Sequence, residues 1–136
     1  MPTSEPRFWR NLKRVGKLPV PWIVKYANGK ILFGFRNLHR MRDCFHKRLC
    51  AVCGEKIVGP LTFAGGVLAT SAGIFNEPNM HEECLRASLD VCPYLKSKVD
   101  PLYATTASGC KMTEKDNSIG YHAQNILRVQ QLIEGV

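Results

Sequence analysis

The sequence predicts a small domain of the α+β class, and three observations lead to that prediction. The chain has 136 residues, a common size for a single domain with one core. Hydrophobic residues make up 45% of it and charged residues 22%, as in ordinary globular proteins. Segments with a strand-like hydrophobic pattern and segments with a helical pattern both occur. We therefore expect residues 1–136 to form a single domain.

Residues 1–17 are a basic segment that predicts a short amphipathic helix. The apolar residues Phe8, Leu12 and Val15 are spaced by four and three positions, with cationic residues between them. Two prolines follow in Leu18-Pro-Val-Pro-Trp22, and they require an extended chain. The helix should therefore end before these prolines, which lead into a strand.

Residues 18–49 predict a β-hairpin and then a basic helix. Two β-rich runs, Trp22 to Ala27 and Lys30 to Phe35, flank Asn28-Gly29, a pair that suits the positive φ angles of a type I′ turn. From residue 37 the hydrophobic period becomes helical, with four apolar residues on one face: Leu38, Met41, Phe45 and Leu49. This helix leads directly into Cys50.

Residues 54–76 are rich in glycine and apolar side chains, and they predict a short hairpin with its turn near Gly65-Gly66. A helix should follow, because Asn79 as the N-cap and Glu82 three residues later form a capping-box pattern. Pro93 would end that helix.

The C-terminal part of the chain, residues 96–136, predicts a long loop followed by a closing helix. Residues 96–118 are polar and have only a weak hydrophobic pattern. In the segment from Ile119 to Glu134, the side chains of Ile126, Val129 and Ile133 would share one helix face.

Two pairs of candidate metal ligands lie on either side of the glycine-rich segment, as Cys50-x2-Cys53 and His81-x2-Cys84. Thiolate and imidazole are ligands that zinc favours, and a tetrahedral site needs four. A Cys-x2-Cys turn followed by Gly54 can present two sulfurs to one ion, and residues three apart on a helix share a face. Four protein ligands leave no position for water, so the sequence predicts a structural zinc site.

Two alternatives for the Cys50/Cys53 pair are redox exchange and inert packing. A redox pair should follow a strand and open a helix, whereas here a helix precedes it and a glycine-rich segment follows. The remaining cysteines, Cys44, Cys92 and Cys110, have no partner at ligand spacing, and we interpret them as packing residues or free thiols.

A cysteine knuckle, a hairpin and a helix N-terminus in this order are the parts of a treble-clef zinc finger. We therefore expect a treble-clef-like unit over residues 50–95. The basic segment 1–17 and the hairpin plus helix of residues 18–49 would precede it, and the loop and closing helix of residues 96–136 would follow.

Positive charge is concentrated in the N-terminal half. The net charge is +8, and residues 1–56 hold thirteen Lys or Arg against three Asp or Glu, while the remainder holds six against eight. Such asymmetry suggests an anionic partner, most often nucleic acid, and the alternative is a merely solvated basic face. Nine basic residues are candidate contacts for nucleic acid or another partner: Arg7, Arg10, Lys13, Arg14, Arg36, Arg40, Arg42, Lys47 and Arg48.

Aromatic residues are interleaved with these cations, and they could stack on unpaired bases or belong to the core: Phe8, Trp9, Trp22, Tyr26, Phe33 and Phe35. We find no catalytic constellation and no small-molecule site, because no phosphate-binding loop, serine elbow or paired carboxylate set is present. Treble-clef nucleases place a His on the hairpin, and none lies between Cys53 and His81. A nuclease is therefore the least favoured function.

The segments "LPVPWIVKYANGK", "RLCAVCGEKI" and "EPNMHEECLRASLDVCPYL" resemble small uncharacterised proteins of bacteriophages, prophages and actinobacterial genomes. The resemblance covers roughly residues 18–95, with Asn79 in place of a second proline and Tyr94 in place of Phe. It implies a phage origin and supports the four zinc ligands. It supplies no activity.

Two functions follow from the sequence. The first is a zinc-stabilised protein that contacts nucleic acid through its basic half. The second is an interaction module that docks on a host enzyme or defence complex and inhibits or redirects it. No apolar run approaches the ~20 residues that span a bilayer, and the first residues lack a signal-peptide stretch. We expect a cytoplasmic protein, in the host cell if it is phage-encoded.

Overall fold

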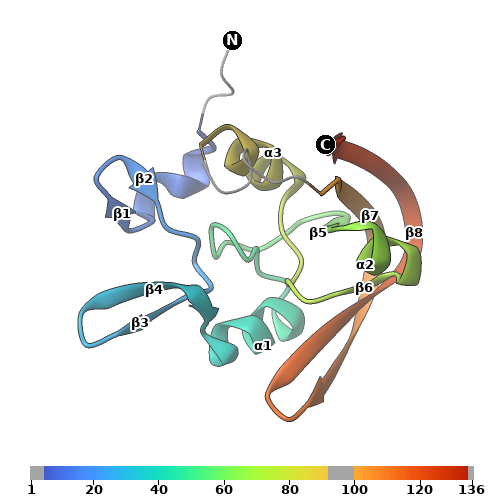
Figure 1. Cartoon of the computed structure of the whole chain (residues 1–136), viewed down its shortest axis with the longest axis horizontal. Coiled ribbons are helices and arrows are strands. Elements are labelled where there is room, and N and C mark those ends of the chain that lie inside the picture. The colour runs from blue at the N-terminus through green and yellow to red at the C-terminus, as the bar shows by residue number, and fades with distance from the viewer. Residues whose placement is uncertain (1–4, 92–99, 135–136) are drawn as a thin grey trace.

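The computed structural model describes residues 5–91 and 100–134, and both helices and strands occur in it, as the sequence predicts (Figure 1). The described part of the chain begins with a five-residue 3-10 helix, η1 (Arg7–Asn11), and a short hairpin of β1 (Arg14–Val15) and β2 (Leu18–Pro19). The predicted helix over the basic segment is therefore wrong beyond residue 11. Gly16, at φ +60°, turns the chain back where that helix would have continued.

The second hairpin confirms the prediction made from Asn28-Gly29. Strands β3 (Val24–Ala27) and β4 (Lys30–Arg36) pair antiparallel, with Ala27 opposite Lys30. Asn28 and Gly29 have φ angles of 51° and 73°, the left-handed conformation that a type I′ turn requires.

The basic helix is also confirmed as α1 (Leu38–His46). Its N-cap is Asn37, whose side chain accepts a hydrogen bond from the backbone N–H of Arg40 at 3.1 Å. Met41 of the predicted stripe is buried, and the other three members of that stripe pack against the core. Cys44 is fully buried beside them, so the buried face is wider than the stripe.

The predicted hairpin in residues 54–76 is not formed. Strand β5 (Leu61–Gly65) is followed by helix α2 (Val67–Ala72) and then by β6 (Ile74–Phe75). These two strands lie at opposite edges of one four-stranded sheet, in the order β5-β7-β8-β6. A hairpin needs its two strands side by side, whereas Gly66 starts a helix here and Gly73, at φ +70°, ends it.

The C-terminal part is a long antiparallel ribbon instead of a loop and a helix. Strands β7 (Leu102–Lys115) and β8 (Ser118–Ile133) pair along their whole length around a two-residue turn, Asp116-Asn117, whose φ angles are 51° and 62°. The pairing register shifts twice along β8. Each shift interrupts the alternation of a strand, so the apolar residues of β8 acquire a spacing that imitates a helix.

Helix α3 (Glu82–Val91) confirms the second predicted helix but not its cap. The helix begins at Glu82, and Asn79 lies three residues before it as a buried side chain. Cys92 and Pro93, where the helix was expected to end, lie outside the described residues.

A core of buried apolar side chains extends from Trp9 to Tyr121 and includes residues of the sheet, of α1 and of α3. Phe63 and Phe75 stack in it with ring centroids 5.3 Å apart. The Tyr121 hydroxyl donates a hydrogen bond to the Met41 carbonyl at 2.8 Å, which ties β8 to α1. None of the helices in the described residues has the length and apolar character needed to cross a membrane.

Candidate metal centre

Cys50 and Cys53 lie in a tight turn that directly follows α1. Leu49 and Lys56 form a β-bridge across its base, and the backbone N–H of Cys50 donates to the Glu55 carbonyl at 2.8 Å. Gly54 has φ +78°, and a Cβ at this position would lie 2.8 Å from the Trp22 ring. Only glycine fits, because both the conformation and the close approach of the indole exclude a side chain.

His81 and Cys84 lie immediately before and within the first turn of α3. Met80 forms a β-bridge with Thr62 of β5, and this bridge fixes the chain before His81. Asn79 connects this segment to the knuckle: its carbonyl accepts from the Ala51 N–H at 3.0 Å. Its side-chain amide donates to the carbonyls of Cys44 and Leu49, at 3.2 and 2.9 Å.

Asn79 is thus a positioning residue that sequence reasoning misassigned as a helix cap. Its side chain is almost completely buried, and it joins the end of α1, the knuckle and the approach to α3. A local pattern could not identify this role, since the carbonyls that it contacts lie 35 and 30 residues earlier.

The four predicted ligands come together as one group, with their ligand atoms all within 4.8 Å of one another. The Nδ1 atom of His81 lies 3.4 Å from Cys53 Sγ and 3.8 Å from Cys84 Sγ. A tetrahedral zinc ion with bonds of about 2.0 to 2.3 Å places its ligand atoms roughly 3.5 to 3.8 Å apart. The donor set and its spacing therefore fit a bound metal ion, and these four residues could hold one.

The ligand atoms also make hydrogen bonds with atoms other than the four ligand atoms themselves. The indole N–H of Trp9 donates to Cys84 Sγ at 3.3 Å, the Glu55 N–H to Cys53 Sγ at 3.4 Å, and the His81 N–H to Cys50 Sγ at 3.3 Å. The other ring nitrogen of His81, Nε2, lies 3.2 Å from the Lys56 carbonyl. Such contacts orient the ligands and stabilise thiolate charge.

The electrostatics of the group favour a negative charge that a cation can neutralise. Burial opposes ionisation of Cys50, but hydrogen bonds from Cys53, Cys84 and His81 outweigh it and lower the pKa of Cys50 far below its ordinary value. Hydrogen bonds to the Cys50 and Cys53 sulfurs raise the pKa of His81 to about 10. The Cys50 sulfur is therefore ionised, and a bound cation would neutralise its negative charge.

The other described cysteines are separate from this group. Cys44 is fully buried, and burial strongly raises the pKa of its thiol. Cys110 is partly exposed, and burial raises its pKa to about 11. Both are free thiols, and Cys92 lies outside the described residues.

Six of the nine predicted contact residues are bound within the chain, which their sequence positions did not reveal. One of them is Arg40, which donates to the Trp22 carbonyl at 2.6 Å. Arg36, Arg42 and Arg14 form ion pairs with Glu77, Glu114 and Glu5, at 2.9, 2.6 and 2.7 Å. Arg48 donates to the Gly59 carbonyl at 2.5 Å, and Lys47 lies 3.8 Å from Asp43.

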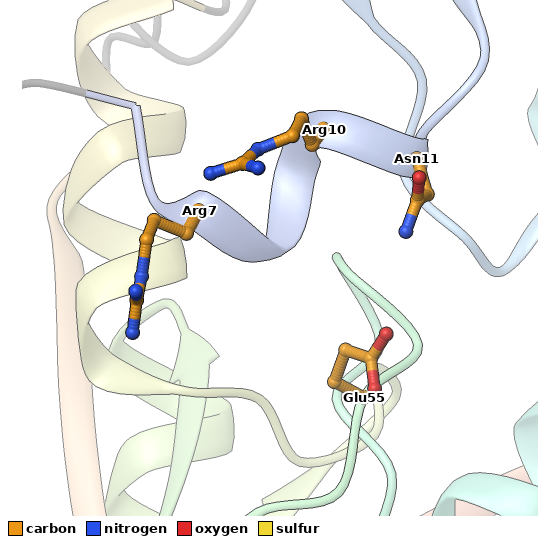
Figure 2. A pocket seen from close by; sticks show the side chains of 4 residues that line it. All are labelled: Arg7, Arg10, Asn11 and Glu55. Carbon is orange, nitrogen blue, oxygen red and sulfur yellow. The ribbon is translucent and has the colours of Figure 1, made fainter.

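Arg40 and the remaining three predicted residues line two neighbouring cavities. Arg7 and Arg10 line one of about 300 Å³ together with Asn11 and Glu55, and Figure 2 shows the two arginines and Asn11 projecting from η1 and Glu55 on the knuckle loop. Lys13 and Arg40 line a second cavity of about 480 Å³, which also contains Asn11 in its wall.

The second cavity also holds two of the predicted aromatic residues. Trp22 and Tyr26 line it, with the Arg40 guanidinium 4.8 Å from the Trp22 ring centroid and the Lys13 ammonium 4.7 Å from that of Tyr26. The ring of Trp9 is buried in the core, and Phe33 and Phe35 are exposed on β4.

Comparisons with protein-family models, with curated proteins and with solved structures found no match. The geometry of the two cavities and of the metal centre is therefore the basis on which a function can be assigned.

Proposed function

We propose that this chain is a phage-type nucleic-acid-binding protein that is stabilised by a structural zinc ion. Cys50, Cys53, His81 and Cys84 would hold the zinc in a site that resembles a treble-clef finger in its knuckle and helix. Zinc is favoured because its preferred ligands are thiolate and imidazole in tetrahedral sites. With four protein ligands the ion would organise the fold and carry out no reaction.

One observation carries the nucleic-acid part of the proposal: the two cationic cavities adjoin at Asn11. Arg7 and Arg10 have no ion-pair partner among the described residues, so their guanidinium groups are available for phosphate oxygens. Glu55, in the wall of the same cavity, would repel a phosphate that entered too deeply.

The second cavity has the chemistry of a base-binding site. Arg40 lies over Trp22, and a guanidinium plane on an indole forms a surface on which a base can stack. Asn11 and Asn37 line the same cavity, and each side-chain amide offers both hydrogen-bond donors and an acceptor. A base enters such a cavity when it is unpaired, so we propose single-stranded nucleic acid as the ligand.

The proposal is tested by fluorescence anisotropy with short single-stranded DNA and RNA oligonucleotides and with a duplex of the same sequence. Single strands should bind more tightly than the duplex, and affinity should fall as salt rises from about 50 to about 300 mM. Arg10→Ala and Lys13→Ala should each reduce the salt slope by roughly 0.7 for every phosphate that the wild-type side chain neutralises.

Lys111→Ala is the matched control, because Lys111 is an exposed lysine on β7 that lies away from both cavities. It should leave the affinity and the salt slope unchanged. Affinity that is flat with salt, or an equal loss in Lys13→Ala and Lys111→Ala, would contradict the proposal.

A second candidate function is docking on a host enzyme or defence complex, with inhibition or redirection of that complex. Phe33 and Phe35 favour it, because they are large apolar side chains two residues apart on β4 and are 47% and 62% exposed. Pull-down from nuclease-treated host lysate separates the two functions. A protein partner that survives nuclease supports docking, and one that disappears supports nucleic-acid binding.

A further inference from the structure

Strand β8 has an open edge along its C-terminal half. On one side it pairs with β7 over its whole length. On the other side the two-residue strand β6 pairs with Tyr121 and His122 alone. Within residues 5–91 and 100–134 no further strand pairs with this edge. The outward backbone N–H and C=O groups from Gln124 to Ile133 therefore form a template for another strand.

The side chains of this half are exposed as well. Every residue from Asn125 to Gln131 is exposed, on both faces of the strand. Three of them are large and apolar: Ile126, Leu127 and Val129, which are 48%, 61% and 49% exposed. Exposed apolar side chains on a free edge are a combination that isolated monomers avoid.

Two of the devices that usually protect a sheet edge, proline and lysine side chains, are missing here. Residues 124–133 contain no proline and no lysine, and their single charge belongs to Arg128. Arg128 forms an ion pair with Glu82 of α3, so it does not guard the edge as a free charge. Register shifts with β7 at Leu102/Tyr103 and at Thr106/Ala107, and the positive φ of Asn125 (55°), interrupt this half of β8. Between the two shifts, the four residues Arg128–Gln131 pair with β7 in regular order.

We propose that this edge pairs antiparallel with the same edge of a second copy of the chain. Apart from Arg128, its polar side chains are neutral amides that can offer donors and acceptors to copies of themselves: Gln124, Asn125, Gln130 and Gln131. The Gln130 oxygen also accepts from Arg86 of α3 at 2.6 Å, which leaves its amide N–H groups for a partner. A two-fold axis through Val129 would place this residue opposite its own copy and Arg128 opposite Gln130 of the other copy, so no like charges meet. The two four-stranded sheets would then continue as one.

The interface is independent of the two cationic cavities, whose lining residues all precede residue 56. An experiment can therefore contradict dimerisation while it supports nucleic-acid binding, or contradict nucleic-acid binding while it supports dimerisation. A dimer would carry two copies of the basic surface, and both could engage one strand of nucleic acid.

The test is the mass of the metal-loaded full chain in solution, measured by size-exclusion chromatography with light scattering. The wild type should have about twice the monomer mass of 15.3 kDa. Val129→Lys places a charge on the edge and should give a monomer. Val58→Lys is the matched control, because Val58 is a 90% exposed valine outside the strands, and it should remain dimeric.

Amide hydrogen exchange locates the interface in the wild type without any variant. The outward amides of residues 124–133 should exchange slowly in the dimer and become faster on dilution. A wild type that stays monomeric at every concentration overturns the proposal. A dimer in which these amides exchange as fast as those of an open edge also overturns it. A Val129→Lys chain that folds and stays dimeric overturns it as well.

Discussion

The indole N–H of Trp9 donates a hydrogen bond to Sγ of Cys84 at 3.3 Å, across 75 positions of sequence. Trp9 belongs to η1, the same turn that carries Arg7 and Arg10, and its ring is buried in the core. The first helical turn is therefore held against the metal centre, and the guanidinium groups beside Trp9 are positioned by the same hydrogen bond.

Trp9→Phe should weaken zinc binding about 10- to 100-fold, because removal of an outer hydrogen bond to a ligand has an effect of this size. The measurement is competition for zinc with a chelator of known affinity. Trp22→Phe is the control, since the Trp22 ring packs on Gly54 and donates no hydrogen bond to a ligand sulfur. Equal zinc affinity in wild type and Trp9→Phe would show that the hydrogen bond has no influence on the metal.

Cys53→Ser should remove stoichiometric zinc and unfold the part of the chain built around the knuckle. Zinc contributes about 10 to 16 kcal/mol to folding in isolated finger peptides, far more than the net stability of most domains. Circular dichroism and metal analysis report the two losses together. Cys110→Ser changes a free thiol outside the ligand group and should retain both the zinc and the spectrum.

The thiol of Cys110 should react slowly with iodoacetamide, and its rate should rise with pH up to about 11. Burial raises the pKa of this thiol from 9.0 to about 11, so it stays protonated where an ordinary thiol ionises. Two pKa units correspond to about 100-fold less thiolate at pH 8 than in an ordinary cysteine. Peptide mapping of the metal-loaded protein, with glutathione as the reference thiol, gives the rates. A pH profile that levels off near 9 would contradict this expectation.

Tyr121→Phe should destabilise the fold by about 0.5 to 1.5 kcal/mol, the net worth of one buried hydrogen bond. The hydroxyl that this change removes donates to the Met41 carbonyl at 2.8 Å and connects β8 to α1. Urea unfolding of the metal-loaded protein measures the change. Tyr103→Phe is the control on the neighbouring strand, and a loss as large as that of Tyr121→Phe would argue against a specific role for the bond.

Local signals predicted the features that depend on a few adjacent residues. Asn28-Gly29 has one preferred turn, so the hairpin of β3 and β4 could be derived from the pair and its flanks. The apolar stripe of α1 and the spacing of the four ligands are local in the same sense. These elements agree with the structure because no distant contact competes with their preference.

The C-terminal ribbon could not be derived in this way. Its turn, Asp116-Asn117, was a usable signal that was missed, since both residues tolerate a positive φ angle. The register shifts along β8 displaced the apolar residues from strict alternation and favoured a helical interpretation. When register shifts interrupt a strand, the spacing of its apolar residues no longer identifies the segment as a strand.

The basic surface was overestimated for a related reason. A count of charges assigns each arginine to solvent, whereas Arg36 and Arg42 have acidic partners 41 and 72 residues later in the chain. The fold alone brings these partners together. Tertiary contacts, and not the local sequence, determine which part of the predicted basic surface remains available to a partner.

The strand order β5-β7-β8-β6 has a consequence for the way the protein is made. The two edge strands are synthesised first, and the ribbon that separates them comes last and must enter between them. A ribosome therefore releases the knuckle, α3 and both edges before any partner for those edges exists. Metal capture at the knuckle can precede completion of the sheet, and a chain that is cut short before β7 would keep its ligands but leave both edges without a neighbour.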